Sequence, residues 1–147
     1  MKIYVASSWR NKFHSWVVDR LRFHGHEVYD FKNPGVDKHA FSWKGVIPNY
    51  QQGEKVTAEE YRRALTHPRA AQGYAYDIGA LKWCDAVVYV LPCGKSASWE
   101  FGFAMGEGKA GFVVMFEPDD PDLMFSEALI IGNEAEFDVI FTPKFKW

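Results

Sequence analysis

The chain of 147 residues contains only two cysteines, Cys84 and Cys93, and its formal net charge at pH 7 is −2. Two cysteines are too few for a disulfide framework or a four-ligand zinc site, so we expect reduced thiols in a cytoplasmic protein. The chain also lacks the basic excess of nucleic-acid-binding and membrane-surface proteins. No apolar run approaches the roughly 20 residues of a membrane span, and the start "MKIYVASSW" lacks the apolar segment of a secretion signal. These absences favour a cytoplasmic protein that binds neither nucleic acid nor membranes.

Histidine is scattered rather than grouped. No H-x-x-x-H motif and no His/Asp cluster is visible in the sequence, and the five histidines lie at positions 14, 24, 26, 39 and 67. We therefore expect no metal site and no other cofactor.

A complete phosphate-binding P-loop is also missing. The stretch "LPCGKSASWEFGFAMGEGK" (91–109) contains Gly94-Lys95-Ser96, which is how such a loop ends. The motif needs a second glycine five residues before Gly94, where this chain has Tyr89, and without it the backbone cannot wrap a triphosphate.

Apolar residues, by contrast, are abundant: 48% of the chain is hydrophobic and 17% is aromatic, enough for a packed core in one domain. Their spacing predicts helices and strands in alternation. The predicted strands are 2–6, 26–31, 85–91, 110–117 and 137–141. The predicted helices lie within 11–25, from 57 to an interruption at Pro68, and within 70–84, 98–108 and 119–130.

This alternation predicts an α/β fold: a three-layer sandwich around a central five-stranded, mainly parallel sheet, flavodoxin-like or Rossmann-like. Segment 85–91 is apolar on both faces, so we place it centrally. We expect a single domain over 1–147 with a long loop and helix insertion at about 32–69. The aromatic residues of the insertion either stack on a base or fill core: Phe41, Trp43 and Tyr50.

Glu100 is a lone acid after the predicted central strand. Ligands of open α/β sheets bind outside the carboxyl ends of the strands. A helix beginning near Ser98 would place Glu100 in its first turn and leave the N–H groups of 95–98 free for an anion. Gly102 and Gly106 would let this helix lie close to the sheet. Alternatively, Glu100 merely offsets the helix dipole. The candidate anion-binding residues of this loop are Gly94, Lys95, Ser96 and Ser98.

The first strand ends in "ASSWRN", which offers a second set of polar groups at the same edge of the sheet. Ser7, Ser8 and Arg10 could contact a phosphate or a sugar. The alternative is a serine that caps the first helix and a surface arginine. Within the strand, Tyr4 alternates with its apolar neighbours.

Asp77 is the third candidate acid. Its spacing from Leu81 and Cys84 places it on their helix face, toward the sheet. Burial would raise the pKa of its carboxyl group, which suits a proton donor. A purely structural hydrogen-bonding role is the alternative.

Three of these segments, in order, resemble the nucleoside 2-deoxyribosyltransferase superfamily, which includes the 2′-deoxynucleoside 5′-monophosphate N-glycosidases. "KIYVASSWRN" resembles its opening strand and Ser/Arg turn. "DIGALKWCDAVVYVL" resembles its D-x-x-x-L-x-x-A-D-V-V-V segment, and "SASWEFGFAMGEGK" its E-L-G-x-A-x-x-x-G-K segment. The resemblance covers 1–31 and 74–117, whereas 32–73 matches no pattern of the superfamily.

The resemblance implies roles. Glu100 matches the nucleophile that attacks C1′ of a deoxyribosyl group, Tyr4 the tyrosine that orients it, and Asp77 the acid that manages the base or a sugar hydroxyl. In the monophosphate branch, Ser8, Arg10 and the 94–98 loop would hold the 5′-phosphate. The implied partner is a small nucleoside or nucleotide, and relatives that complete their pockets across subunits imply a homodimer or higher homo-oligomer.

Two other functions stay open at this stage. A non-catalytic nucleotide-binding or sensing module would use the same cleft without turnover. An NAD glycohydrolase would cleave a chemically similar ribosyl bond. The identity of the base cannot be read from the sequence, and the terminal "FTPKFKW" (141–147) could pack against a partner or the chain's own core.

Overall fold

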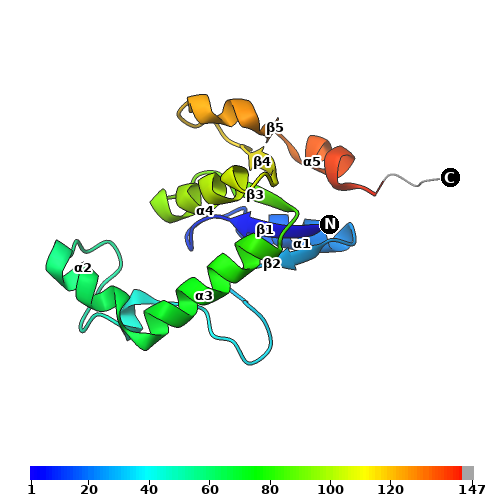
Figure 1. Ribbon diagram of the computed structural model, residues 1–147. Helices are drawn as coiled ribbons and strands as arrows, with labels where there is room; N and C mark the ends of the chain where they lie inside the picture. The colour runs from blue at the N-terminus through cyan, green and yellow to red at the C-terminus, as the bar shows by residue number, and fades with distance from the viewer. Residues whose placement is uncertain (144–147) are drawn as a thin grey trace. The chain divides into compact units, whose positions relative to one another are not determined.

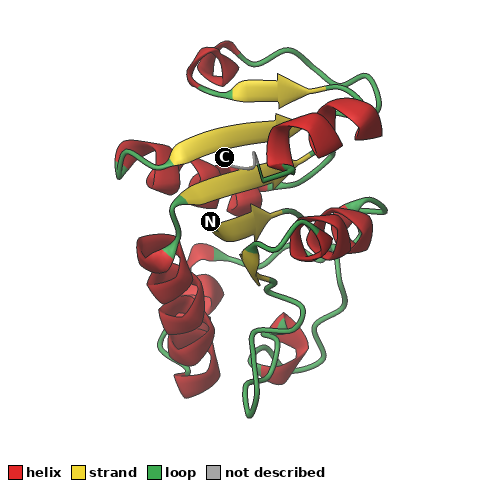
Figure 2. Cartoon of the chain, turned by 90° about the vertical axis from the view of Figure 1, so that its right-hand side faces the viewer, coloured by secondary structure: helices red, strands yellow, loops and turns green. Residues whose placement is uncertain are grey.

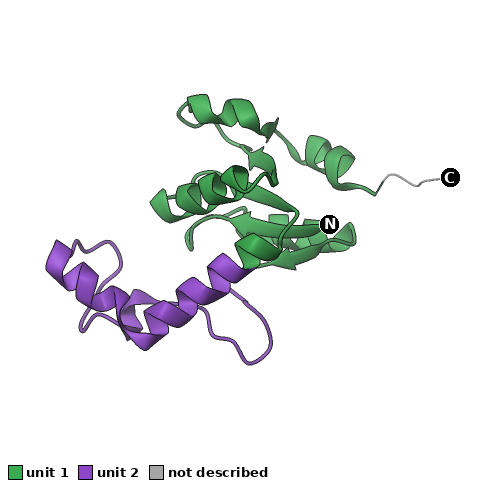
Figure 3. Cartoon of the chain, viewed as in Figure 1, with its two compact units in different colours: residues 1–30, 80–147 green, residues 31–79 purple. Residues whose placement is uncertain are grey.

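The computed structural model describes residues 1–143 as two compact units (Figure 3). Unit 1 contains residues 1–30 and the chain from residue 80 onward, and unit 2 contains residues 31–79. The expectation of one domain with an insertion stays a prediction. Most of the terminal "FTPKFKW" segment, residues 144–147, lies outside the described residues.

Unit 1 is built on a five-stranded parallel sheet (Figure 1). Its strands follow the order β2-β1-β3-β4-β5, which is the flavodoxin-like order and confirms the predicted fold class. Strand β3 is central and buried along its whole length, as its apolar sequence predicts. The strands are β1 (Lys2–Ala6), β2 (Glu27–Tyr29), β3 (Ala86–Val90), β4 (Ala110–Val114) and β5 (Leu129–Ile131).

Helices cover both faces of this sheet (Figure 2). Helices α1 (His14–Phe23) and α5 (Glu134–Phe141) pack on one face, where alternate strand residues meet them in a single hydrophobic cluster. Helix α4 (Lys95–Gly106) contacts β1, β3 and β4. The cluster under α1 and α5 includes Ile3, Val5, Val17, Leu21, Val88, Val90, Phe137 and Phe141.

The prediction of a strand at 137–141 is wrong, because these residues form the second half of α5. Phe137 and Phe141 are four residues apart, so a helix turns both rings into the core, while the intervening Val139 is exposed. Asn133 starts the helix, since its side chain accepts a hydrogen bond from the Glu136 N–H at 2.9 Å. That cap is the signal that the sequence reading missed.

The helix predicted at 119–130 is also largely wrong. Asp122 does cap a helix, because its carboxylate accepts from the Met124 N–H at 2.8 Å, but the helix is a short 3₁₀ segment, Leu123–Glu127. The following residues pair with β4 as the fifth strand. Strand β5 is only three residues long, so its apolar pattern is too short to separate it from the helix before it.

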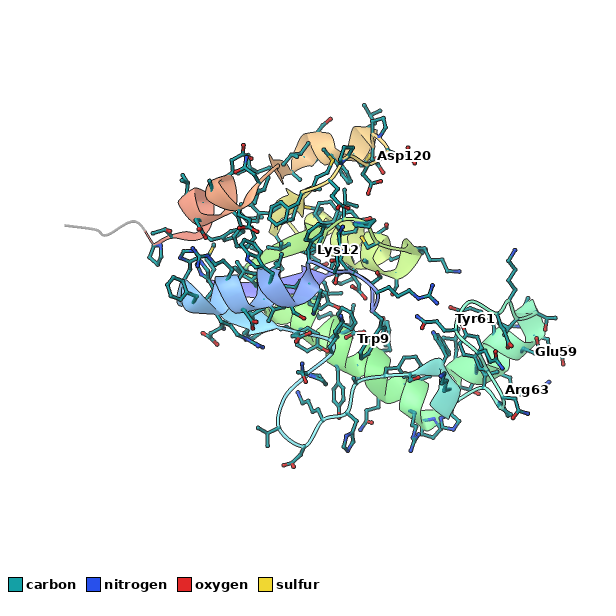
Figure 4. The ribbon with its side chains drawn as sticks, turned by 180° about the vertical axis from the view of Figure 1, so that it is seen from behind. Trp9, Lys12, Glu59, Tyr61, Arg63 and Asp120 are labelled. Atoms are coloured by element: carbon teal, nitrogen blue, oxygen red, sulfur yellow. The ribbon has the colours of Figure 1, made fainter. Side chains whose placement is uncertain are left out.

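Unit 2 contains a 3₁₀ turn (Trp43–Gly45), α2 (Ala58–Leu65) and most of α3 (Pro68–Trp83). Helix α2 starts with a capping box, in which Thr57 is the N-cap and Glu60 is its partner. On α2, Arg63 donates to Glu59 at 3.2 Å (Figure 4). Proline at 68 occupies the first position of α3, where its missing N–H costs nothing.

The aromatic residues of unit 2 pack against one another. The ring of Trp43 meets Phe41 edge-on at 4.8 Å and Tyr61 at 5.6 Å. A Cβ at position 73 would lie only 3.0 Å from Phe41, so glycine lets that ring approach α3 closely. Phe41 and Trp43 are half-buried and pack against residues of their own unit.

Candidate functional site

The loops after β1 and β3 form the candidate site, because these strands are neighbours where the strand order reverses. Asn11 joins the two loops. Its side-chain amide donates to the carbonyl oxygens of Val90 and Pro92, both at 2.9 Å, while its Oδ1 accepts from the Phe13 N–H at 2.8 Å. Asn11 is the last residue of the "ASSWRN" motif, but the motif alone did not indicate this role.

Glu100 lies on α4, in a different turn from the one predicted. The helix begins at Lys95 with Gly94 as its N-cap, three residues earlier than expected, so Glu100 falls in the second turn. The Ser98 N–H is already bonded to the Gly94 carbonyl at 3.4 Å and is not free for an anion. Because the helix-dipole effect fades beyond the first turn, it contributes little to the charge of Glu100.

The periodicity of α4 shows which way Glu100 faces. Ala97, Phe101 and Ala104 are buried against the sheet, and Glu100 is half-buried beside them. The flank of α4 that carries Gly102 and Gly106 lines a pocket with the 3₁₀ segment beyond β4. Glu100 lies on the opposite flank, which is the side of β1.

Tyr4 is fully buried in β1. Its neighbours Ile3 and Val5 join the cluster under α1 and α5, so the alternation of the strand turns Tyr4 to the α4 side. Its ring stacks on Tyr29 of β2, with centroids 5.1 Å apart. The structure thus brings the predicted nucleophile and its predicted orienting tyrosine to the same side of the sheet.

The residues of the β1 turn differ in exposure. Ser7 is buried, Ser8 is half-buried and Arg10 is exposed. Ser7 does not cap α1, whose N-cap is Phe13. Lys12 forms an ion pair with Glu117 beyond β4, and the exposed ring of Trp9 lies in the same turn (Figure 4). Arg10 is therefore the exposed cation of this turn that could bind an anion.

The loop after β3 exposes Gly94, Lys95 and Ser96. Ser96 donates a long hydrogen bond of 3.4 Å to Oε1 of Glu100, one turn further along α4. Ser98 is engaged elsewhere, since its hydroxyl lies 2.7 Å from that of Tyr89. Ser96 therefore lies beside Glu100, whereas Ser98 lies on the pocket side of α4.

The pocket on the far flank of α4 has a volume of about 480 Å³. A Cβ built at Gly102 or Gly106 would meet nothing within 4 Å, so the prediction that these glycines let α4 lie close to the sheet is wrong. Both glycines instead widen this pocket. Its other lining residues are Tyr89, Ser98, Phe101, Met105, Asp122, Met124, Phe125 and Glu127.

Asp77 is half-buried on α3 and belongs to unit 2. Leu81 and Cys84, with which it was predicted to share a face, are buried in unit 1. That Asp77 shares a site with Glu100 and Tyr4 stays a prediction.

Burial controls the chemistry of Cys93, next to the candidate site. The pKa of the Cys93 thiol is raised to about 11, chiefly by burial and also by the carboxylates of Asp119 and Glu100, while a hydrogen bond with Tyr89 acts in the opposite direction. Burial likewise raises the pKa of Tyr89 to about 12. Both groups are therefore neutral at physiological pH.

We predict that Cys93 reacts with iodoacetamide at pH 7.5 roughly a hundredfold more slowly than an ordinary thiol, because only the thiolate attacks. The rate should rise with pH toward 11, since the thiolate fraction grows with pH. Mass spectrometry of the alkylated protein measures this rate, and the urea-unfolded chain is the control. Alkylation of the folded protein at the unfolded rate would contradict the prediction.

Two histidines form pairs with aspartates that are distant in the sequence. His14 is bonded to Asp30 at 2.7 Å, and His24 to Asp138 at 2.8 Å. Arg20 and His24 together lower the pKa of the Asp138 carboxyl well below its usual range. The members of each pair come from separate elements, so no linear motif could have revealed them.

No helix among residues 1–143 is long and apolar enough to cross a membrane. Among the same residues, no three side chains of the types His, Cys, Asp and Glu gather as metal ligands would.

No known family model matches the chain, and neither does any curated protein sequence. Among solved structures, a 2-deoxyribosyltransferase from the psychrotolerant bacterium Bacillus psychrosaccharolyticus matches with a TM-score of 0.63 and 19% identity. The match covers 99% of this chain and 93% of that one. The chain has the fold of a 2-deoxyribosyltransferase. The likeness includes residues 32–73, for which the sequence motifs offered no counterpart.

Proposed function

We propose that this protein is an enzyme that cleaves or transfers the N-glycosidic bond of a (deoxy)nucleoside or its 5′-monophosphate, with Glu100 as the nucleophile. The observation that carries the proposal is the position of Glu100, half-buried on the β1 flank of α4, at the switch point of a sheet with the deoxyribosyltransferase fold. Tyr4 lies on the same side of the sheet, and we propose that it orients Glu100.

In the first step, a carboxylate oxygen of Glu100 attacks C1′ and the C1′–N bond breaks. The bonding electrons leave on the base nitrogen, which Asp77 or water protonates. In the second step, water or a second base attacks C1′, the ester C–O bond breaks, and the proton of the acceptor passes to a base. Two displacements retain the configuration at C1′. Water as acceptor makes the enzyme a hydrolase, and a second base makes it a transferase.

For a 5′-monophosphate substrate, Ser8, Arg10 and residues 94–96 are the proposed phosphate contacts, since they follow the two strands at the switch point, whereas Ser98 is engaged with Gly94 and Tyr89. We further propose that the protein acts in the cytoplasm as a homodimer or a higher homo-oligomer, because the superfamily that it resembles completes its pockets across subunits.

The proposal is tested by incubating the protein with a panel of nucleosides, their 2′-deoxy forms and the 5′-monophosphates of both, and separating free bases by chromatography. We expect base release from at least one 2′-deoxy compound, accelerated by a second base if the enzyme is a transferase. NAD is included in the panel, and release of nicotinamide alone would contradict the proposal. Binding without release of any base would also contradict it.

A further inference from the structure

The pocket between α4 and the 3₁₀ segment Leu123–Glu127 lies entirely within unit 1 and has an aromatic floor. The ring of Tyr89 stacks on that of Phe101 with their centroids 5.0 Å apart, and the ring of Phe125 meets both edge-on, at 5.9 and 6.4 Å. Tyr89 and Phe101 are only 6% and 7% exposed, so packing holds these rings in place. The volume of about 480 Å³ is that of a site for a small organic molecule.

Glycine keeps this pocket open. Gly102 lies in the interior of α4, where glycine weakens a helix relative to alanine, yet a Cβ there would meet nothing within 4 Å. No close packing therefore requires glycine at this position, and its missing side chain provides space beside the helix. Met105 and Met124 contribute to the walls, and the flexible methionine side chain adapts its shape to a ligand.

The rim of the pocket is acidic. Asp122 and Glu127 line it and are exposed to solvent, whereas none of the lining residues within 1–143 is Lys, Arg or His. Residues 118–127 include further acids, among them Asp120 (Figure 4), and no basic residue. The carboxylate of Asp122 lies near the phenol of Tyr89, because it adds to the effect of burial, which is the main cause that raises the pKa of Tyr89. The rim thus offers negative charge and hydrogen-bond acceptors above an apolar floor.

This combination of floor and rim selects one class of ligand. The carboxylates repel an anion, and a metal ion does not suit a rim where, among residues 1–143, no three potential ligands gather. A neutral apolar molecule would cover the rings but displace water from the carboxylates without replacing its hydrogen bonds. An organic cation fits both parts, because its apolar body covers the floor, its charged head donates to the carboxylates, and aromatic rings themselves attract cations.

We propose that this pocket is a binding site for a small organic cation, an amine or amidine with an aromatic body, and that Asp122 and Glu127 pair with its charged head. The pocket lies on the opposite flank of α4 from Glu100. The inference therefore does not depend on the proposed function, and either can fail without the other.

The experiment uses benzylamine as the probe, with benzyl alcohol as its neutral isostere and benzoate as its anionic counterpart. Nuclear magnetic resonance of methionine methyl groups localises the binding, because two of the four methionines, Met105 and Met124, line the pocket, whereas Met1 and Met115 do not. We expect benzylamine to shift the signals of Met105 and Met124 saturably and to leave the other two unchanged. Its affinity should exceed that of benzyl alcohol about tenfold, and benzoate should not bind.

The carboxylates are tested by Asp122→Asn and Glu127→Gln, which preserve the size of each side chain. An asparagine at 122 still accepts from the Met124 N–H and so keeps the cap of the 3₁₀ segment. Each variant should weaken the binding of benzylamine about threefold, as expected for one exposed charge pair. The two changes together should remove the preference for benzylamine over benzyl alcohol.

The pocket itself is tested by Gly102→Leu, whose side chain fills the space beside α4 and should abolish the binding of benzylamine. Leucine favours a helix, so the fold should be maintained, and thermal unfolding verifies this. The matched control is Gly79→Leu, because Gly79 is also a helical glycine whose Cβ would meet nothing within 4 Å, but it lies on α3 and does not line the pocket. Gly106→Leu fills the same pocket and replaces Gly102→Leu if that variant does not fold.

Several results would overturn the inference. These are equal affinities for benzylamine and benzyl alcohol, no change in the signals of Met105 and Met124, and binding that survives in the pocket-filling variant. Sedimentation of the wild-type protein and of Gly102→Leu detects a different occupant. A wild-type oligomer that this variant dissociates, with no binding of benzylamine, would show that a second copy of the chain covers the pocket, and the proposed cation site would be wrong.

Discussion

Replacing Glu100 with glutamine should reduce the rate of base release by at least about a thousandfold, because the amide is a poor nucleophile and cannot form the glycosyl ester. The change preserves the size of the side chain, and the bond that Glu100 accepts from Ser96 is long, 3.4 Å. The fold and the affinity for a product sugar should therefore be maintained. Single-turnover assays with the substrate found in the panel measure the rate, and thermal unfolding verifies the fold.

Glu107→Gln is the matched control for this variant. Glu107 is the C-cap of the same helix and is exposed, so the same chemical change there should leave the rate within about twofold of wild type. A second signature is the intermediate itself: rapid quenching of the wild-type reaction should trap a sugar on the peptide that contains Glu100. Base release by Glu100→Gln at the wild-type rate would remove Glu100 from the mechanism.

The parallel sheet was predictable because its strands are short and apolar, and because the segments between them carry apolar residues at helical spacing. β3 is the clearest example, since it is buried on both faces and its sequence is apolar throughout. The end of the chain was less predictable: "FDVIF" alternates like a strand, yet it also places Phe137 and Phe141 on one helix face. Only the cap at Asn133 favours the helix, and a pattern of five residues cannot choose between the two periods.

The candidate site was predictable where its residues follow strands. Ser7, Ser8 and Arg10 were placed at the carboxyl end of β1, and residues 94–98 at that of β3, where the structure has them. The partners that hold these loops could not be found in this way. Asn11, His14 and Asp30 act on residues from other elements, and such pairings depend on how the strands assemble.

The spacing of the two glycines in α4 led to a wrong prediction of which side of this helix faces the sheet. Two glycines spaced four apart in a helix suggested a close approach to the sheet, but a Cβ at either position would meet open space. The sheet-facing side of α4 uses Ala97 and Ala104 instead, both nearly inaccessible. The helix thus approaches the sheet through its alanines, and the spacing of small residues alone did not show which pair faces inward.

Asn11 is the residue whose loss should damage both stability and function. Asn11→Ala should lower the free energy of unfolding by about 2–4 kcal/mol, because the carbonyl oxygens of Val90 and Pro92 lose their donor in a site where Asn11 is only 7% exposed. Asn11→Asp should cost more, since it directs carboxylate oxygens at the same two carbonyl oxygens. Urea unfolding measures both variants.

The same substitution should also impair catalysis, because the Asn11 amide fixes the loop that leads from β3 into the helix carrying Glu100. A displacement of that helix start misaligns the nucleophile, and we expect the fraction of Asn11→Ala that stays folded to release base about 10–100 times more slowly. Asn133→Ala is the control: it removes the cap of α5 and should cost about 1 kcal/mol of stability. Because α5 lies under the opposite face of the sheet from α4, activity should be retained in that control. Equal activity in folded Asn11→Ala and Asn133→Ala would show that the β1–β3 bridge serves stability alone.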